Sequence, residues 1–248
     1  DDMYAFLREV TDSNSEPIIA YMNARKEVLE LKTAVKTQVF AEEKPTPTGE
    51  REALLASMAA KGDFSKLEAE ALADAAKKAL TEASPSRDPQ TVDLILDRAL
   101  YEYRRDIAGT SGIEYLSTVC KNDADIKNLC TAFRLKRRKA LPENAENFFY
   151  DGGAISVPDL MLFVKEPEKA KKALSATEYG TLALELADKK ASPSECEKAL
   201  EEKYYAGLMK VKDDIFGSGK VVAYAILYEK WLCDLRLLLT AKKVGKTI

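Results

Sequence analysis

The sequence contains no histidine, and its four cysteines form no Cys-x-x-Cys pair. Without imidazole, the chain lacks the commonest acid–base group near neutral pH and every Ser–His or Cys–His arrangement for nucleophilic catalysis. A structural zinc site needs clustered thiolate or imidazole ligands, so we expect none here and no other cofactor. The cysteines are Cys120, Cys130, Cys196 and Cys233. Those at 130 and 233 fall within apolar helical patterns, which is typical of reduced core cysteines in a cytosolic protein.

Long apolar runs are also missing. A helix needs roughly 18 to 20 apolar residues to cross a bilayer, and the best run, residues 221–227, is short and interrupted by Tyr224. We therefore expect a protein that does not cross a membrane. Glycine is scarce, with 11 in 248 residues, while 46% of residues are hydrophobic and 32% charged, as in helix-rich soluble proteins. The net charge of -3 gives no global reason to expect nucleic acid as a partner.

Helical periodicity dominates the chain. One apolar stripe repeats at spacings of three and four and consists of Val92, Ile95, Leu96, Ala99, Tyr103 and Ile107. Asp88 followed by Pro89 is typical of an N-cap and first helical turn, and residues 175–178 and 192–195 have the pattern of capping boxes. Turn residues predict loops at 45–49, 84–86, 150–153 and 216–219. The fold class is therefore all-α, with about ten helices and the longest loop after Phe40.

Three widely spaced segments resemble one another. Residues 30–32, 125–127 and 234–236 each contain an acid, an aliphatic residue and a base. When the alignment of these segments is continued toward the C-terminus without gaps, three apolar stripes match. They are Leu31, Ala34 and Val35; Ile126, Leu129 and Cys130; and Leu235, Leu238 and Leu239. Flanking features agree in order: residues 92–97 resemble 196–201, and residues 62–65 resemble 153–156, a turn whose serine can cap the next helix.

The spacing of these segments is too long for a stacked solenoid. It predicts three helical subdomains arranged around a pseudo-threefold axis, a funnel-like arrangement that can close around a cavity. We place the subdomains at residues 1–86, 87–190 and 191–248.

Several of these segments also resemble a known family, the C subunits of prokaryotic V-type (A/V-type) ATPases, whose eukaryotic member is the d subunit. Residues 125–129, Arg134 and residues 151–156 resemble the family's stretch "D-l-x-N-l … R … p-G-G-x-l-s". Residues 221–224, Glu229, residues 234–236 and residues 242–245 look like its "v-i-a-Y … E … l-r-i-l … K-x-g" segment. Glu30 departs from the asparagine usual in the family's "N-L-K" helix.

The resemblance runs from about Tyr4 to the C-terminus and implies a non-catalytic rotor subunit. The family forms a funnel of three helical subdomains on the cytoplasmic face of the membrane proteolipid ring, and this funnel receives the tip of the central shaft. The implied partners are the shaft subunits and the proteolipid ring, with no nucleic acid and no small-molecule substrate. Coupling to proton or sodium-ion transport would be mechanical, within a peripheral membrane complex.

The resemblance also bears on the start of the chain. Members usually have further N-terminal helices, and this sequence opens at Asp1 without an initiator methionine, so we expect the first subdomain to be incomplete. Two alternatives stay open: a helical-repeat scaffold unrelated to rotary ATPases, and an all-α lyase or transferase with polar groups converging in a pocket.

Two segments resemble parts of a phosphate-binding loop. Residues 245–247 end like one, but Thr240 stands where glycine is needed, and residues 219–221 lack both the earlier glycine and the magnesium-binding hydroxyl. Turn and helix-end chemistry explains both segments, so we expect no nucleotide site.

A basic run is the candidate for partner binding. It comprises Arg134, Lys136, Arg137 and Arg138, followed by Lys139. These cations could contact an acidic partner or the anionic membrane surface, or could simply complement a helix C-terminus. Glu197, Glu201 and Glu202 have the spacing of an exposed helix face. The tyrosines and the tryptophan suit either an interface or core packing, and the sequence leaves that choice open: Tyr101, Tyr103, Tyr204, Tyr205, Tyr224, Tyr228 and Trp231.

Overall fold

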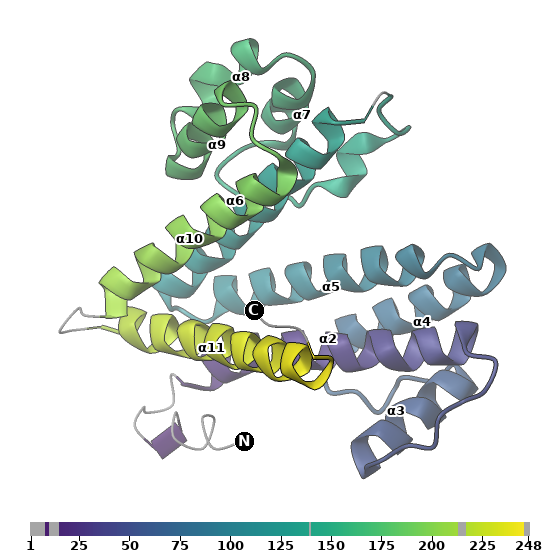
Figure 1. The fold of residues 1–248 in the computed structure, drawn as a ribbon. Coiled ribbons are helices and arrows are strands. Elements are labelled where there is room, and N and C mark those ends of the chain that lie inside the picture. The colour runs from purple at the N-terminus through teal and green to yellow at the C-terminus, as the bar shows by residue number, and fades with distance from the viewer. Residues whose placement is uncertain (1–7, 10–14, 139, 213–216, 246–248) are drawn as a thin grey trace. The chain divides into compact units, whose positions relative to one another are not determined.

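The computed structural model describes residues 8–9, 15–138, 140–212 and 217–245 (Figure 1). These residues contain ten α-helices with defined bounds, one 3-10 helix and no strand, so the all-α prediction is confirmed. The helices are α2 (Ser15–Phe40), α3 (Glu50–Lys61), α4 (Glu70–Ser86), α5 (Pro89–Thr110), α6 (Glu114–Lys136), η1 (Ala145–Phe148), α7 (Val157–Lys165), α8 (Pro167–Leu174), α9 (Glu178–Asp188), α10 (Pro193–Lys212) and α11 (Gly219–Lys243).

The chain divides into two compact units, residues 1–112 and residues 113–248. Helix α5, which we expected at the start of the second subdomain, packs on α2 and α4 and lies in the first unit. The division into three repeats at 1–86, 87–190 and 191–248 stays a prediction.

In the first unit, α2 packs against α3, α4 and α5. Val92 and Leu96 of the predicted stripe are fully buried, and Ile95, Ala99 and Tyr103 pack against the same core. The same core contains Leu31 and Val35 of α2, both with 0% exposure. The helical periodicity therefore located the core-facing side of α5 correctly, because burial of an apolar stripe is the main free-energy gain for such a helix.

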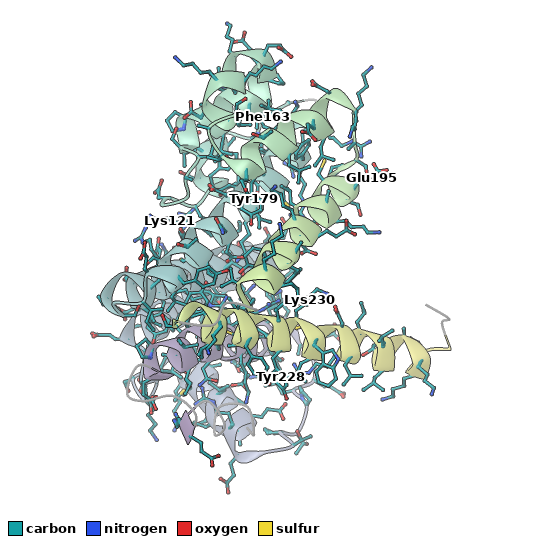
Figure 2. All side chains as sticks on the ribbon, turned by 90° about the vertical axis from the view of Figure 1, so that its left-hand side faces the viewer. Lys121, Phe163, Tyr179, Glu195, Tyr228 and Lys230 are labelled. Atoms are coloured by element: carbon teal, nitrogen blue, oxygen red, sulfur yellow. The ribbon has the colours of Figure 1, made fainter. Side chains whose placement is uncertain are left out.

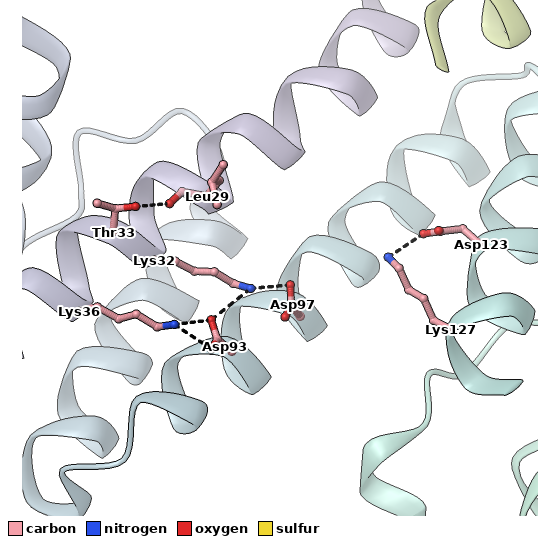
Figure 3. Close-up of polar contacts among 8 residues, drawn as sticks. All are labelled: Leu29, Lys32, Thr33, Lys36, Asp93, Asp97, Asp123 and Lys127. Atoms are coloured by element: carbon pink, nitrogen blue, oxygen red, sulfur yellow. Dashed lines mark hydrogen bonds and ion pairs between the residues drawn. The ribbon is translucent and has the colours of Figure 1, made fainter. Parts of the chain in front are cut away.

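A ladder of ion pairs runs beside this core (Figure 3). The Lys32 ammonium lies 2.7 Å from Asp97 and 3.4 Å from Asp93. Lys36 donates to both oxygens of Asp93, at 2.8 and 2.7 Å. Two lysines one turn apart on α2 thus face two aspartates one turn apart on α5, which fixes the register of the two helices.

In the second unit, α6 contacts α7, α9, α10 and α11. Its buried face includes Leu129 and Cys130, which share a core with Phe163 of α7 and Leu200 of α10. The Phe133 and Phe163 rings meet edge to face with centroids 5.5 Å apart, an arrangement that aromatic quadrupoles favour. Figure 2 shows Phe163 within this lobe and Tyr228 on α11.

Most predicted helix starts are confirmed. Asp88 accepts a hydrogen bond from the Gln90 N–H and precedes Pro89 in the first turn. Ser192 and Glu195 form the predicted capping box, because each side chain accepts from the other residue's main-chain N–H. Ser156 caps α7 by accepting from the Asp159 N–H.

Two predicted caps are wrong. Helix α9 is capped by Thr177, which accepts from the Gly180 N–H, whereas Ser175 ends the preceding helix α8. Ser65 does not cap α4, whose N-cap is Ala69; instead the Ser65 N–H donates to Asp63. In both cases an intervening turn shifts the helix start beyond the serine.

The predicted loops at 45–49 and 150–153 are confirmed. The loop at 84–86 is wrong, because α4 continues through Pro85 to Ser86 and ends at Arg87, whose φ is 52°. Pro85 has no N–H to donate, and it stands in the last turn of the helix, two residues before the C-cap. Residues 217 and 218 form the turn before α11, and Phe216 lies outside the described residues.

The three matching segments lie on α2, α6 and α11. Their stripes are buried in the first two helices, where Leu31, Val35 and Leu129 all have 0% exposure. In α11 the aligned leucines are open: Leu235 is 37% exposed, Leu238 50% and Leu239 59%. Among the described residues the aligned stripes of α2 and α6 are thus buried, whereas the aligned leucines of α11 are exposed.

Candidate partner-binding site

The four candidate cations lie at the C-terminal end of α6. Arg134 and Lys136 belong to its last turn, Arg137 is the C-cap residue, and the Arg138 N–H donates to Leu135 O at 3.0 Å. Unpaired carbonyls make a helix C-terminus electronegative, so this position stabilises all four positive charges.

Two of these cations have partners within the fold. An Arg134 guanidinium nitrogen lies 2.8 Å from a Glu197 carboxylate oxygen on α10. The Lys136 ammonium lies 4.5 Å from the centre of the Phe163 ring, a cation–π contact. Partial burial lowers the pKa of Lys136, although nearby Asp188 acts in the opposite direction. These two residues therefore brace α6 against α10 and α7.

Arg137 and Arg138 are exposed, and within the described residues neither has an ion-pair partner. Arg134 is exposed as well, but its guanidinium is paired with Glu197. An acidic partner surface could approach Arg137 and Arg138 without breaking a contact of the fold.

A loop clamp lies about two turns earlier on α6, among residues that belong to both the internal repeat and the family pattern. The two Asp125 carboxylate oxygens accept hydrogen bonds from the N–H groups of Ile155 at 3.0 Å and Ala154 at 3.1 Å. A Cβ atom at Gly153 would lie 2.3 Å from Asp125 Oδ1, so only glycine allows this approach. The signal available in sequence was the pairing of an acid with a distant Gly-Gly turn.

Asn128 completes the clamp one turn later. Its side-chain amide donates to Tyr150 O and accepts from Tyr150 N–H, both at 2.8 Å. Asn128 is fully buried and Asp125 is 1% exposed. Buried polar groups of this kind are stable only when they are hydrogen-bonded, and together they fix the loop 150–155 against α6.

A polar cavity of about 290 Å³ opens beside the clamp. Its lining comes from α6, α9, α10 and the residues that join them: Tyr115, Asn122, Asp125, Ala154, Thr177, Glu178, Tyr179, Lys203, Tyr204, Gly207, Leu208 and Val211. Burial raises the pKa of Asp125, although its main-chain hydrogen bonds act in the opposite direction. Burial also raises the pKa of Tyr179 to about 12. A lyase or transferase would need groups free to exchange protons here, whereas both Asp125 oxygens hold the loop.

The segments that resemble phosphate-binding loops lie at the two ends of α11. Gly219 is the first residue of that helix, and Gly245 follows its last turn with a φ of 71°. Both glycines thus serve helix ends, while residues 246 and 247 lie outside the described residues. Across the described part of the chain, His, Cys, Asp and Glu form no group of three that could hold a metal ion.

The aromatic residues divide between core and surface. Tyr101 is 3% exposed and Tyr103 packs on the core of the first unit. On α11, Tyr224 is 41% exposed and Trp231 57%, and Tyr228 lies between them with ring centroids 6.2 and 5.9 Å away. The structure thus places the interface-like aromatics on α11.

No helix among the described residues combines the length and the apolar character that crossing a membrane requires.

One comparison with known proteins identifies a family. The model of the ATP synthase (C/AC39) subunit family matches residues 2–246, which is nearly the whole chain. No curated protein and no solved structure matches the chain. The family match covers the segments from which the resemblance was drawn, including the clamp of α6 and the aromatic helix α11. The chain therefore belongs to the ATP synthase (C/AC39) subunit family, and so to the subunits of V/A-type ATPases.

Proposed function

We propose that the protein is the central-stalk rotor adaptor of a V/A-type ATPase. In this role it connects the rotating shaft to the membrane proteolipid ring, and ATP-driven rotation is coupled mechanically to proton or sodium-ion transport. The observation that supports it most is the family match over residues 2–246. Family membership also removes the alternative of a scaffold unrelated to rotary ATPases.

Polar contacts between helices support a role in transmitting torque. Helices within each unit are joined by specific polar contacts: the Lys32–Asp97 and Lys36–Asp93 pairs at 2.7 Å in the first unit, and the Arg134–Glu197 pair at 2.8 Å in the second. Such contacts resist sliding of one helix on another, which transmission of torque requires. The proposed role asks for no catalytic residue.

The finer arrangement is part of the same proposal. Three pseudo-repeated subdomains would surround a pseudo-threefold axis and form a funnel for the shaft tip. The protein would lie on the cytoplasmic face of the membrane as a peripheral part of the ATPase complex. The correspondence of α2 with α6 supports this, because their matching stripes are buried in the same way, with Leu31 and Leu129 both at 0% exposure.

Arg137 and Arg138 are the proposed contact residues for an acidic partner. They are exposed at the end of α6, and the field of the helix terminus already stabilises their charge. Arg134 and Lys136 position this end of the helix through Glu197 and Phe163.

The test is capture of the tagged protein from native membrane extract, with mass spectrometry of the proteins that co-purify. Recovery of shaft, catalytic-head and proteolipid subunits is the expected result. A matched control is the same tag on an unrelated helical protein. Reproducible absence of both shaft and ring subunits, with the tagged chain folded, would overturn the adaptor role.

A further inference from the structure

Helix α11 carries an open apolar stripe with regular spacing. Its members are Tyr224, Tyr228, Trp231, Leu235 and Leu238, here called the α11 stripe. Successive members are four, three, four and three residues apart, which is the spacing of a seam that packs against another helix. Most of the stripe is open: Trp231 is 57% exposed and Leu238 50%, and the flanking Leu239 is 59% exposed. Figure 2 shows Tyr228 and Lys230 on this helix.

The two aligned helices show what covers such a stripe. Leu31 and Val35 of α2 are buried by a core that includes Val92 and Leu96 of α5. Leu129 and Cys130 of α6 are buried by a core that includes Cys196 and Leu200 of α10. Each covering helix thus contributes two apolar residues four positions apart.

The covering helices share a second feature. An acid follows each of these apolar residues, so that α5 has Asp93 and Asp97 and α10 has Glu197 and Glu201. The acids pair with cations of the covered helix: Asp97 lies 2.7 Å from Lys32, and Glu197 lies 2.8 Å from Arg134.

The same cations recur on α11. In the gapless alignment, Lys32 corresponds to Arg236, since each ends its acid–aliphatic–base triplet, and Arg134 corresponds to Lys243, since each lies nine residues after the triplet's acid. Both are exposed, and no described residue pairs with either. Helix α11 as a whole has five basic and two acidic residues. It therefore presents an exposed apolar stripe together with positive charges like those of α2 and α6.

We propose that the α11 stripe is the docking site for an acidic amphipathic helix in which two apolar residues four positions apart are each followed by Asp or Glu. Within each unit a helix of that pattern covers the aligned stripe, α5 on α2 and α10 on α6. The occupant that the pattern predicts for the α11 stripe is a helix of the same kind from a partner protein. Its acids pair with Arg236 and Lys243. The inference stands apart from the rotor-adaptor proposal, because it rests on the helix pairs within each unit.

A second copy of the chain fits less well, because two α11 helices would bring like charges together. A lipid surface also fits less well. Alternating spacings of four and three are typical of a stripe that packs against another helix. The aligned stripes of α2 and α6 are also covered by helices.

The experiment measures binding of a fluorescein-labelled synthetic peptide with the sequence of residues 89–110 to the 248-residue chain, by fluorescence anisotropy. Saturable binding is expected. Leu238→Asp combined with Leu239→Asp should weaken it by more than about tenfold, because two leucines that the bound peptide would bury become charged. The matched control is Leu29→Asp, at a leucine that is 60% exposed in the first unit, and should leave binding unchanged.

A charge exchange tests the ion pairs. Arg236→Glu with Lys243→Glu should weaken binding about fivefold, the value expected for two exposed pairs. A peptide carrying Asp93→Lys and Asp97→Lys should restore binding to this variant and bind the unchanged chain weakly. Because both substituted residues of the chain are exposed, circular dichroism should show unchanged helix content.

Three results would overturn the proposal. The peptide could bind the unchanged chain, the double leucine variant and the double charge variant equally. The chain could form a dimer that Leu238→Asp with Leu239→Asp dissociates, which would make a second copy the occupant. Or vesicles of anionic phospholipid could bind the chain through these leucines while the peptide does not bind, which would make α11 a lipid contact.

Discussion

The Asn128 side chain makes two hydrogen bonds to one residue, because its amide both donates to Tyr150 O and accepts from Tyr150 N–H at 2.8 Å. This pairing satisfies both main-chain groups of Tyr150 from a side chain with 0% exposure. It holds the loop 150–155 to α6 in the way that a neighbouring strand would.

Replacing Asn128 with alanine should lower the free energy of unfolding by about 2 to 3 kcal/mol, because two buried hydrogen bonds are lost and their partners are left unsatisfied. Urea unfolding monitored by circular dichroism measures it. Thr118→Ala on the same helix is the control, since the exposed Thr118 hydroxyl bonds only to Glu114 O within α6. Equal losses for the two variants would show that Asn128 does not hold the loop.

Asp125 should make stability fall as pH rises through the acidic range. Burial raises its pKa, so between its ordinary pKa and its raised value the folded chain binds more protons than the unfolded chain. The contribution is greatest below the ordinary pKa and is lost as pH rises to the folded-state value. Asp125→Asn removes this titration. The stability of the unchanged chain relative to this variant should therefore decrease as pH rises above about 4, the ordinary pKa of an aspartate, as measured by urea unfolding; a constant difference would contradict the assignment.

Arg104 places a guanidinium in the interior of the first unit. It is 7% exposed, its Nε donates to Tyr21 O at 2.9 Å, and its charge lies 4.5 Å from the centre of the Tyr21 ring. One Nη nitrogen, Nη2, has no hydrogen-bond acceptor among the described residues.

Arg104→Lys should lower the free energy of unfolding by about 1 to 3 kcal/mol, because lysine keeps the buried charge but loses the planar stack and the Nε bond. Arg104→Met should cost less, since it also removes the desolvated charge. Thermal and urea unfolding give the order of the two variants. The reverse order would show that the cation itself stabilises the fold.

The cysteines should differ in reactivity. Cys120, Cys130 and Cys196 are buried and Cys233 is half-buried. Burial raises the pKa of Cys130 to about 12, which suppresses the reactive thiolate. With a disulfide reagent at about pH 8, Cys233 should react first, and Cys233→Ser should remove the fast phase. Fast loss of a second thiol in that variant would indicate that a buried cysteine is accessible.

Arg137 and Arg138 should matter for association more than for folding. Arg137→Glu with Arg138→Glu should reduce recovery of partner subunits from membrane extract about fivefold, because an acidic partner would meet like charge. Lys171→Glu with Lys172→Glu is the control, as these two lysines lie in the last turn of α8. Equal recovery by both variants would remove the arginines from the candidate site.

The helices and most of their N-terminal caps could be predicted from the sequence. The Asp88, Ser156 and Ser192 caps depend on residues within three positions, so local patterns located them. The cap at Thr177 was missed, because two nearby sites, Ser175 and Thr177, offer a hydroxyl and the turn between helices decides which is used. Pro85 suggested a break, but its place in the last turn lets the helix end normally.

The candidate site was less predictable. The run from Arg134 to Arg138 is visible as charge, but the division into braced and exposed cations depends on Glu197 and Phe163, which lie far along the chain. The aligned stripes of Leu31, Ile126 and Leu235 are equivalent as pattern. Their different exposure is set by which helices follow them, and no local pattern contains that information.

The lysine–aspartate ladder gives the α2–α5 pair a stepwise resistance to sliding. Lys32 and Lys36 meet Asp93 and Asp97 at intervals of one turn, so the attraction along the helix axis repeats every ~5.4 Å. Displacement by half a turn would set each ammonium between carboxylates, while a full turn would restore part of the pairing. Under axial load the two helices should therefore keep one register until the force is large enough to shift one helix by a full turn along the other.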